Sequence, residues 1–151
     1  MTQNKKILVT GGAGYIGSVL VPKLLEQGYH VHVLDNLMYK QTSLVHLFSN
    51  KNFRFTKGDI CDYPLLKTLI DESEIIIHLA AIVGAPACKQ NPPLAKLVNF
   101  EAPLFLLKSL KPHHQVLFPT TNSGYGVGEK DKFCTEQSPL KPISLYGQLK
   151  V

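Results

Sequence analysis

Arginine is almost absent from this 151-residue chain. Arg54 is the single arginine, so lysine carries nearly all of the positive charge behind the net charge of +5. The lysines are scattered, and Lys5-Lys6 is their one adjacent pair. A nucleic-acid-binding domain gathers its basic residues in a patch or stripe, so this distribution argues against a nucleic-acid partner. The excess charge suits long-range attraction of a diphosphate ligand better.

Cysteine is sparse too. The three cysteines, Cys61, Cys88 and Cys134, are widely spaced and include no C-x-x-C pair. The close histidine pairs, at 30/32 and 113/114, have no carboxylate or cysteine at ligand spacing. We therefore expect neither a disulfide framework nor a metal site, and a reducing cytoplasm as the compartment.

Long hydrophobic runs are missing as well. The most apolar stretch, 75–88, is too short to cross a bilayer and is interrupted by a histidine, a glycine and a proline. The first six residues contain no apolar segment of the kind found in a signal peptide. The sequence therefore predicts no association with a membrane.

Short aliphatic runs alternate with longer helical segments along the whole chain. The expected strands are 7–9, 31–35, 53–56, 75–77 and 116–118, and the expected helices are one that ends at residue 27, then 44–50, 63–71, 92–110 and one from about residue 145. Pro22 falls inside the first helix, where we expect a bend and not a break. This alternation predicts a single α/β domain over residues 1–151, a doubly wound parallel sheet covered on both faces.

Three glycines, Gly11, Gly14 and Gly17, follow the first expected strand at once and open the first helix. Glycine allows the tight turn, the close approach of a pyrophosphate to the backbone and the close packing of helix on strand. The amino end of the helix offers free N–H groups and partial positive charge to a diphosphate. Asp35 ends the second strand, 18 residues after Gly17. This strand–turn–helix context predicts a Rossmann-type dinucleotide site.

Asp35 also bears on the choice of cofactor. A carboxylate at the end of the second strand accepts hydrogen bonds from ribose hydroxyls and repels a 2′-phosphate. No arginine lies nearby to reverse that preference, although Lys40 would soften it. The sequence favours NAD over NADP.

The glycine spacing G-x-x-G-x-x-G is joined by T-T-N-S-G-Y-G at 120–126 and by Y-x-x-x-K at 146–150. With these motifs in this order, the chain resembles the extended short-chain dehydrogenase/reductases, the NAD-dependent epimerase/dehydratase family, and especially its UDP-glucose 4-epimerase group. The resemblance runs from Lys6 to Lys150. It implies an enzyme that acts on nucleotide-diphosphate sugars, with a homodimeric parent.

The resemblance also implies a set of cofactor contacts. They are Tyr15 and Ile16 for the pyrophosphate, Asp35 and Asn36 for the adenosine ribose, Asp59 and Ile60 for the adenine, Leu79, Ala80 and Ala81 for the nicotinamide side with Asn99 nearby, and Lys150 for the nicotinamide ribose. Simpler roles stay open for some of them. Ile60 and Leu79 could be core residues, and Asp59 or Asp62 could cap a helix.

Tyr146 and Lys150 are four residues apart, which places them on one face of a helix, one turn apart. Such a pair suits a base that takes an alcohol proton while hydride leaves the same carbon. Ionising a phenol at neutral pH needs about 4 kcal/mol of extra stabilisation. A cation about 6 Å away supplies about 2.8 kcal/mol at an effective dielectric of about 20. The lysine therefore needs a second contributor, for which oxidised nicotinamide is the obvious choice. Tyr125 is the competing tyrosine, but its nearest following lysine has the wrong helical phase.

Aligned on Tyr125-Gly126, the resemblance makes Thr121 the hydroxyl that hydrogen-bonds the reacting oxygen, with Ser123 as the alternative. Dehydratases of the family carry an Asp-Glu pair after their threonine, where this chain has Asn122-Ser123. We therefore expect an epimerase that oxidises C4 transiently. A nucleotide-sugar reductase, a 4,6-dehydratase and a non-catalytic NAD-binding fragment remain alternatives.

The resemblance implies a truncated sheet of about five strands in the order 3-2-1-4-5, with further strands and a substrate-binding domain absent. We then expect 116–118 to be an exposed apolar edge strand and the last helix to be too short to hold its shape alone. The 151-residue polypeptide is accordingly expected to be catalytically silent and poorly behaved as a monomer.

Overall fold

The computed structural model of the chain describes residues 5–128 and 133–151. The chain divides into two compact units. The sheet unit comprises residues 1–80 and 102–118, and the helical unit comprises residues 81–101 and 119–151.

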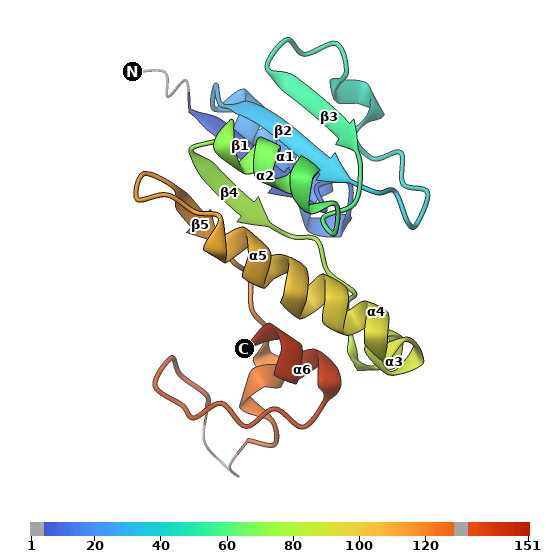
Figure 1. Cartoon of the computed structure of the whole chain (residues 1–151), viewed down its shortest axis with the longest axis vertical. Coiled ribbons are helices and arrows are strands. Elements are labelled where there is room, and N and C mark those ends of the chain that lie inside the picture. The colour runs from blue at the N-terminus through green and yellow to red at the C-terminus, as the bar shows by residue number, and fades with distance from the viewer. Residues whose placement is uncertain (1–4, 129–132) are drawn as a thin grey trace. The chain divides into compact units, whose positions relative to one another are not determined.

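The sheet unit is built on five parallel strands in the order β3-β2-β1-β4-β5, as Figure 1 shows. The strands are β1 (Lys6–Thr10), β2 (His30–Asp35), β3 (Phe53–Lys57), β4 (Ile75–His78) and β5 (Gln115–Leu117). All five strands predicted from the aliphatic runs are present, and the predicted strand order is confirmed. Because the strands are parallel, the residues that follow β1, β2, β3 and β4 emerge at one edge of the sheet.

Helices cover both faces of this sheet. They are α1 (Tyr15–Glu26), α2 (Tyr63–Asp71) and α5 (Ala102–Lys108). Val21 and Leu25 of α1 are buried in one core cluster with Val9, Val31 and other strand residues of the same face. α2 lies on the other face, in front of the sheet in Figure 1. The predicted doubly wound fold is therefore confirmed.

Local chemistry explains where the helices begin and continue. The Asp62 carboxylate accepts a hydrogen bond from the N–H of Leu65 and caps α2. Of Asp59 and Asp62, the two acids considered as helix caps, Asp62 is thus a cap. α1 continues unbroken through Pro22, as predicted. α2 and α5 also contact each other, because the rings of Tyr63 and Phe105 stack with centroids 4.4 Å apart.

Several boundaries differ from the sequence-based predictions. The helix predicted over 44–50 is only the 3-10 turn η1 (Val45–Leu47). The helix predicted over 92–110 is present as a continuous helical run over residues 92–108, in which the π-helical turn η2 (Leu97–Glu101) joins α4 (Pro92–Lys96) to α5. The short helix α3 (Ala85–Gln90) was not predicted. Gly84 precedes α3, and prolines lie in the first turns of α3 and α4, where a missing backbone N–H is tolerated.

The two outer strands are less buried than the inner ones. β3 begins with buried Phe53, but its remaining residues are exposed or half-buried. Among the residues that the structure describes, β5 pairs only with β4, and Leu117 is 53% exposed. The exposed edge strand expected from the sequence is therefore present.

The helical unit holds α3, α4, η2, the 3-10 turn η3 (Asn122–Tyr125) and α6 (Leu145–Lys150). The Ser144 hydroxyl accepts a hydrogen bond from the N–H of Gly147 and caps α6. Gly147 sits so close to η3 that a Cβ there would lie 2.8 Å from the carbonyl oxygen of Ser123. This short helix is therefore held by its cap and by packing against its neighbours.

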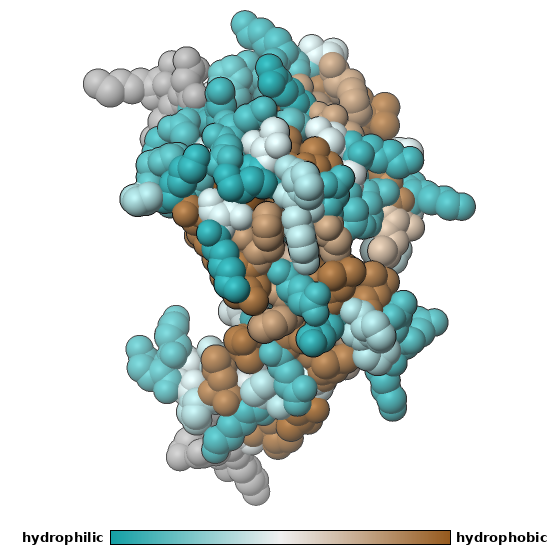
Figure 2. Space-filling model, viewed as in Figure 1, coloured by the Kyte–Doolittle hydropathy of each residue, from teal (hydrophilic) through white to brown (hydrophobic). Residues whose placement is uncertain are grey.

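Figure 2 shows mostly hydrophilic side chains over the visible face of the sheet unit. Within residues 5–128 and 133–151, no helix combines the length and hydropathy needed to cross a membrane. No group of three or more histidine, cysteine or acidic side chains that could hold a metal ion is found in that part of the chain.

Candidate cofactor and catalytic site

The glycine loop joins β1 to α1 at the carboxyl edge of the sheet. Gly11 has φ +68°, and a Cβ on it would lie 2.5 Å from the backbone nitrogen of Ala80. Gly17 lies in the first turn of α1, where a Cβ would meet the Gly12 carbonyl oxygen. Gly12, which the motif did not single out, packs against the methyl groups of Val33. Side chains at these positions would push the loop away from the strands, so the loop needs glycine.

The amino end of α1 is exposed. Gly14 is the residue before the helix and provides no side-chain cap for its N–H groups. Tyr15 is 93% exposed and Ile16 is 56% exposed. An uncapped helix amino terminus carries partial positive charge and free N–H donors. These two residues therefore lie where a bound diphosphate could reach their backbone.

Asp35 ends β2 and is 8% exposed. Its Oδ2 accepts the N–H of Ala13 at 3.0 Å, and its Oδ1 accepts the N–H of Leu37 at 2.8 Å. Each carboxylate oxygen has a second lone pair. The acid therefore ties the glycine loop to the end of β2 and keeps acceptor capacity for ribose hydroxyls.

The loop after Asp35 is ordered by its own hydrogen bonds. The Asn36 side-chain oxygen accepts the N–H of Met38, and Leu37 O accepts the N–H of Lys40. Leu37 and Lys40 have φ values of 56° and 55°. Left-handed backbone at non-glycine residues costs about 1–2 kcal/mol each, so the surrounding contacts must hold this shape.

Asn36 is also linked to Asp59, which follows β3. The Asn36 amide donates to Asp59 Oδ2 at 2.9 Å, and the N–H of Cys61 donates to Asp59 Oδ1 at 2.9 Å. Burial opposes ionisation of this carboxyl, but the hydrogen bonds from Cys61 and Asn36 outweigh it and lower the pKa of Asp59 below its usual value. Ile60 is 5% exposed and is therefore a core residue in this structure. The structure thus brings the predicted ribose and adenine residues together in the sheet unit.

A buried pair that the sequence did not reveal lies beside the glycine loop. Thr10 ends β1, His78 ends β4, and Thr10 Oγ1 and His78 Nδ1 are 2.8 Å apart. The imidazole stacks on the ring of Phe118 with centroids 5.3 Å apart. Leu79, which follows, packs against the core cluster, and Ala80 touches the glycine loop. The position of His78 at the end of an aliphatic run did not predict its contact with Thr10.

In the helical unit, Asn99 is 2% exposed and lies in the π-helical turn η2. Its side-chain oxygen accepts the N–H of Ile82 at 2.8 Å, and its amide donates to the Ile82 carbonyl at 2.8 Å. Both polar atoms of Asn99 thus fix the segment that begins at Ala81. An influence of Asn99 on a ligand would pass through this backbone.

α6 places the Y-x-x-x-K pair on one helix, as predicted. Tyr146 is half-buried, and Lys150 is 7% exposed. Burial lowers the pKa of the Lys150 ammonium below its usual value. The Thr120 hydroxyl donates to the Lys150 carbonyl at 2.8 Å, which connects the end of α6 to the segment before η3.

η3 carries the predicted hydroxyl. Thr121 is the cap of this turn, and its Oγ1 accepts the N–H of Ser123 at 3.2 Å. The turn ends at Gly126, whose φ of +69° brings it so close to Lys141 that any Cβ would overlap the Lys141 carbonyl. η3 and α6 form one packed body that carries Thr121, Tyr146 and Lys150, because a Cβ on Gly147 of α6 would lie 2.8 Å from the carbonyl oxygen of Ser123 in η3.

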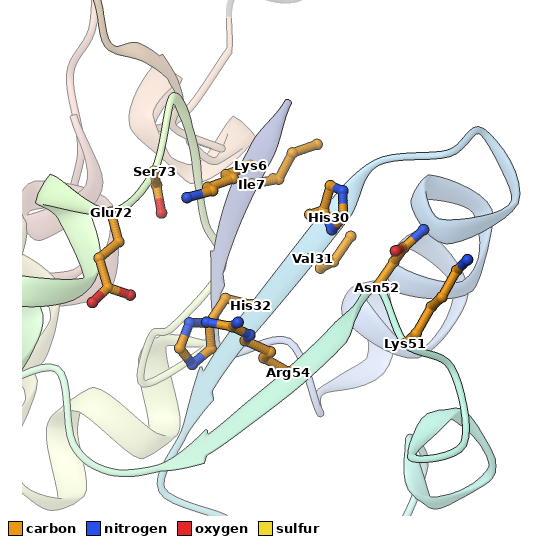
Figure 3. Close-up of a pocket in the computed structure, with 10 residues that line it drawn as sticks. All are labelled: Lys6, Ile7, His30, Val31, His32, Lys51, Asn52, Arg54, Glu72 and Ser73. Atoms are coloured by element: carbon orange, nitrogen blue, oxygen red, sulfur yellow. The ribbon is translucent and has the colours of Figure 1, made fainter. Parts of the chain in front are cut away.

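A pocket of about 430 Å³ lies elsewhere, at the amino ends of β1, β2 and β3. Figure 3 shows its lining, which includes Lys6, His30 and Arg54. None of the predicted site residues lines it. The residues of the sheet unit that are predicted to bind the cofactor lie at the opposite edge of the sheet, where the strands end.

Comparison with known proteins identifies the group to which this arrangement belongs. Residues 7–151 match the NAD dependent epimerase/dehydratase family. The chain belongs to that family. A UDP-glucose 4-epimerase of Mycolicibacterium smegmatis is 35% identical over 97% of the chain and 48% of its own length.

Two solved structures of the epimerase/dehydratase family have the same fold. The UDP-glucose 4-epimerase of Thermus thermophilus, in complex with NAD, aligns with a TM-score of 0.83 and 31% identity, over 96% of this chain and 47% of that one. A dTDP-glucose 4,6-dehydratase of Streptomyces venezuelae, with NAD bound, aligns with a TM-score of 0.85 and 32% identity, over 96% of this chain and 48% of that one. The chain thus spans about half the length of these epimerase/dehydratase relatives.

Proposed function

We propose that this chain is the NAD-binding part of a nucleotide-sugar epimerase that oxidises C4 of the sugar transiently. The observation that carries the proposal is the packed body formed by η3 and α6. This body contains the half-buried Tyr146 and the buried Lys150. It also contains the turn that Thr121 caps, against which Gly147 of α6 packs. The matched UDP-glucose 4-epimerases and the NAD-bound structures support the same interpretation.

The sheet unit fits NAD. At Gly11 and Gly17 a Cβ would collide with neighbouring backbone, so the loop is shaped to run close to the sheet and to the helix amino terminus. Gly11, Gly14 and Gly17 with Tyr15 and Ile16 would hold the diphosphate, Asp35 and Asn36 the adenosine ribose, and Asp59 and Ile60 the adenine. Leu79 and Ala80 would line the nicotinamide side. Of the residues in the helical unit, Ala81 would also line the nicotinamide side, Asn99 would act on the ligand through the backbone of Ile82, and Lys150 would bind the nicotinamide ribose. When bound, NAD⁺ supplies the hydride acceptor.

The helical unit would supply the proton chemistry. Tyr146 accepts the proton of the C4 hydroxyl, so that the C–O bond becomes a carbonyl as the C4 hydrogen departs with its electron pair. Thr121 donates a hydrogen bond to the reacting oxygen. Lys150 provides positive charge that stabilises the phenolate. After the keto-sugar turns over, the same residues return the proton while hydride is delivered to the opposite face.

A 4,6-dehydratase also needs an acid and a base that remove water. The residues after Thr121 are Asn122, an exposed amide, and Ser123, whose backbone N–H donates to Thr121 Oγ1. Neither side chain can exchange a proton as a carboxyl group does. This favours the epimerase over the dehydratase.

The proposed compartment is the cytoplasm. Cys61, Cys88 and Cys134 form no disulfide in the structure. A reducing compartment keeps cysteines in the thiol form.

The test uses a polypeptide that joins residues 1–151 to the remaining half of a UDP-glucose 4-epimerase relative. It is incubated with NAD⁺ and UDP-glucose deuterated at C4, and the products are followed by mass spectrometry and NMR. The proposal expects UDP-galactose of unchanged mass that retains the deuterium, without net formation of NADH. Loss of water would indicate a dehydratase, and stoichiometric consumption of cofactor would indicate a reductase; either would contradict the proposal.

A further inference from the structure

One serine lies across from the glycine loop in the sheet unit. Ser43 follows the ordered loop that begins at Asp35, and its hydroxyl donates to the Ala13 carbonyl at 2.7 Å. Ala13 itself is 3% exposed. The bond joins two segments 30 residues apart. It therefore connects the loop after β2 directly to the loop that precedes α1.

Three hydrogen bonds converge on the peptide groups around Ala13. The Ala13 N–H donates to Asp35 Oδ2 at 3.0 Å, and the Gly14 N–H donates to the Gly11 carbonyl at 3.2 Å. Ser43 holds the remaining polar atom, the Ala13 carbonyl. These hydrogen bonds hold both polar atoms of the Ala13–Gly14 peptide group. Without them, the glycine would allow this peptide group to rotate.

The placement of Ser43 is itself fixed by the core. The next residue, Leu44, is 3% exposed and belongs to the same core cluster as Ala13. At its other end the loop is tied down by the two hydrogen bonds of Asp35. The hydroxyl is consequently delivered to the Ala13 carbonyl by a segment anchored at both ends.

We propose that Ser43 is a positioning residue for the diphosphate of the cofactor. This inference rests on the proposed NAD binding. The Ala13–Gly14 peptide immediately precedes the first turn of α1, whose N–H groups would bind the diphosphate. By holding its carbonyl, Ser43 fixes the orientation in which that turn starts. Ligand affinity is then gained because the donors are arranged before binding.

The test compares Ser43→Ala with Ser43→Thr, which keeps a hydroxyl, and with Ser109→Ala. Ser109 is a matched control, because its hydroxyl donates to the Phe105 carbonyl at 2.8 Å and is also half-buried. The affinity of the full chain for NAD⁺ and for adenosine, which lacks phosphate, is measured by calorimetry and NMR. Hydrogen exchange of the Gly14 amide is measured without ligand.

We expect Ser43→Ala to weaken NAD⁺ binding roughly three- to tenfold, the range expected for one lost hydrogen bond. Adenosine affinity should stay within twofold, Gly14 exchange should accelerate, and Ser43→Thr should restore most of the NAD⁺ affinity. Ser109→Ala should bind as the wild type does.

The proposal is overturned if Ser43→Ala binds NAD⁺ as tightly as the wild type. It is also overturned if adenosine affinity falls by the same factor as NAD⁺ affinity, since that would show a general loosening of the unit. If the wild-type chain does not bind NAD⁺, the proposed function fails instead. Gly14 exchange in Ser43→Ala then decides the positioning role: faster exchange supports it, and unchanged exchange overturns it.

Discussion

The carboxylate of Asp35 accepts the backbone N–H of Ala13 at 3.0 Å, so the end of β2 is tied to the glycine loop that follows β1. An acid at this place has two roles. It holds the loop, and it keeps acceptor capacity for the ribose of the proposed NAD. Changes at Asp35 should therefore affect both the stability of the loop and the choice of cofactor.

Replacing Asp35 with Asn should shrink the preference for NAD⁺ over NADP⁺ at least tenfold, because the charge that repels a 2′-phosphate is removed. An amide can also accept only through its oxygen, so one of the two N–H partners is lost, at a cost of about 1–2 kcal/mol of unfolding free energy. Titration calorimetry with both nucleotides, together with urea unfolding, measures the two effects. Glu26→Gln, at an exposed acid of the same unit, is the control. An unchanged ratio in Asp35→Asn would remove the acid from cofactor selection.

Gly11→Ala should destabilise the chain by at least about 2 kcal/mol and abolish NAD⁺ binding, since left-handed backbone and overlap with Ala80 add together. Gly128→Ala is the matched control, because a Cβ there meets nothing within 4 Å. Thermal unfolding and calorimetry of both variants check the prediction. Equal stability of the two variants would show that the turn does not need glycine.

Burial lowers the pKa of Lys150 from its usual 10.5. Between the folded and unfolded pKa values the unfolded state binds more protons, so stability rises with pH. The loss of stability caused by burying the charged ammonium is fully present below the folded pKa and disappears above 10.5. Lys150→Met should therefore raise the unfolding midpoint at pH 7 and flatten the rise toward pH 10.5.

Lys108→Met, at an exposed lysine, changes the net charge equally and should leave this pH profile unchanged. Urea unfolding of both variants from pH 7 to about 10.5 supplies the comparison. If stability rises with pH as steeply in the Lys150 variant as in the wild type, burial does not lower the pKa of the Lys150 ammonium.

Tyr146→Phe should lower turnover of the joined polypeptide by about 10²–10⁴-fold and leave NAD⁺ affinity within a few-fold, because the phenol acts in proton transfer. Tyr125→Phe is the companion variant and should keep most of the activity. Initial rates with UDP-glucose and calorimetry with NAD⁺ measure both properties. If Tyr146→Phe retained more than a tenth of the turnover, Tyr125 would become the better candidate for the base.

The sheet and the glycine loop were predictable from the sequence, because aliphatic runs and glycine spacing are local signals. The same holds for α6, where Tyr146 and Lys150 share a helix as their spacing requires. Side-chain contacts between segments far apart in the sequence were not predictable. Ser43 and Ala13, 30 residues apart, and Thr10 and His78, 68 residues apart, follow no periodic pattern.

The π-helical turn inside the helix predicted over 92–110 could not be predicted from the sequence either. Asn99 turns its side chain inward to bind both backbone groups of Ile82, and the π-helical turn η2 surrounds it. π-helical turns are rare and often lie at functional sites. Apolar periodicity carries no information about such a turn, since it depends on a partner 17 residues away.

The most direct test of this account is calorimetric titration of the wild-type chain with NAD⁺ and, separately, with NADP⁺. Asp35 at the end of β2 and the uncapped amino terminus of α1 predict that NAD⁺ binds and that NADP⁺ binds at least tenfold more weakly. Equal affinities, or no binding of either nucleotide by a folded chain, would contradict the central claim.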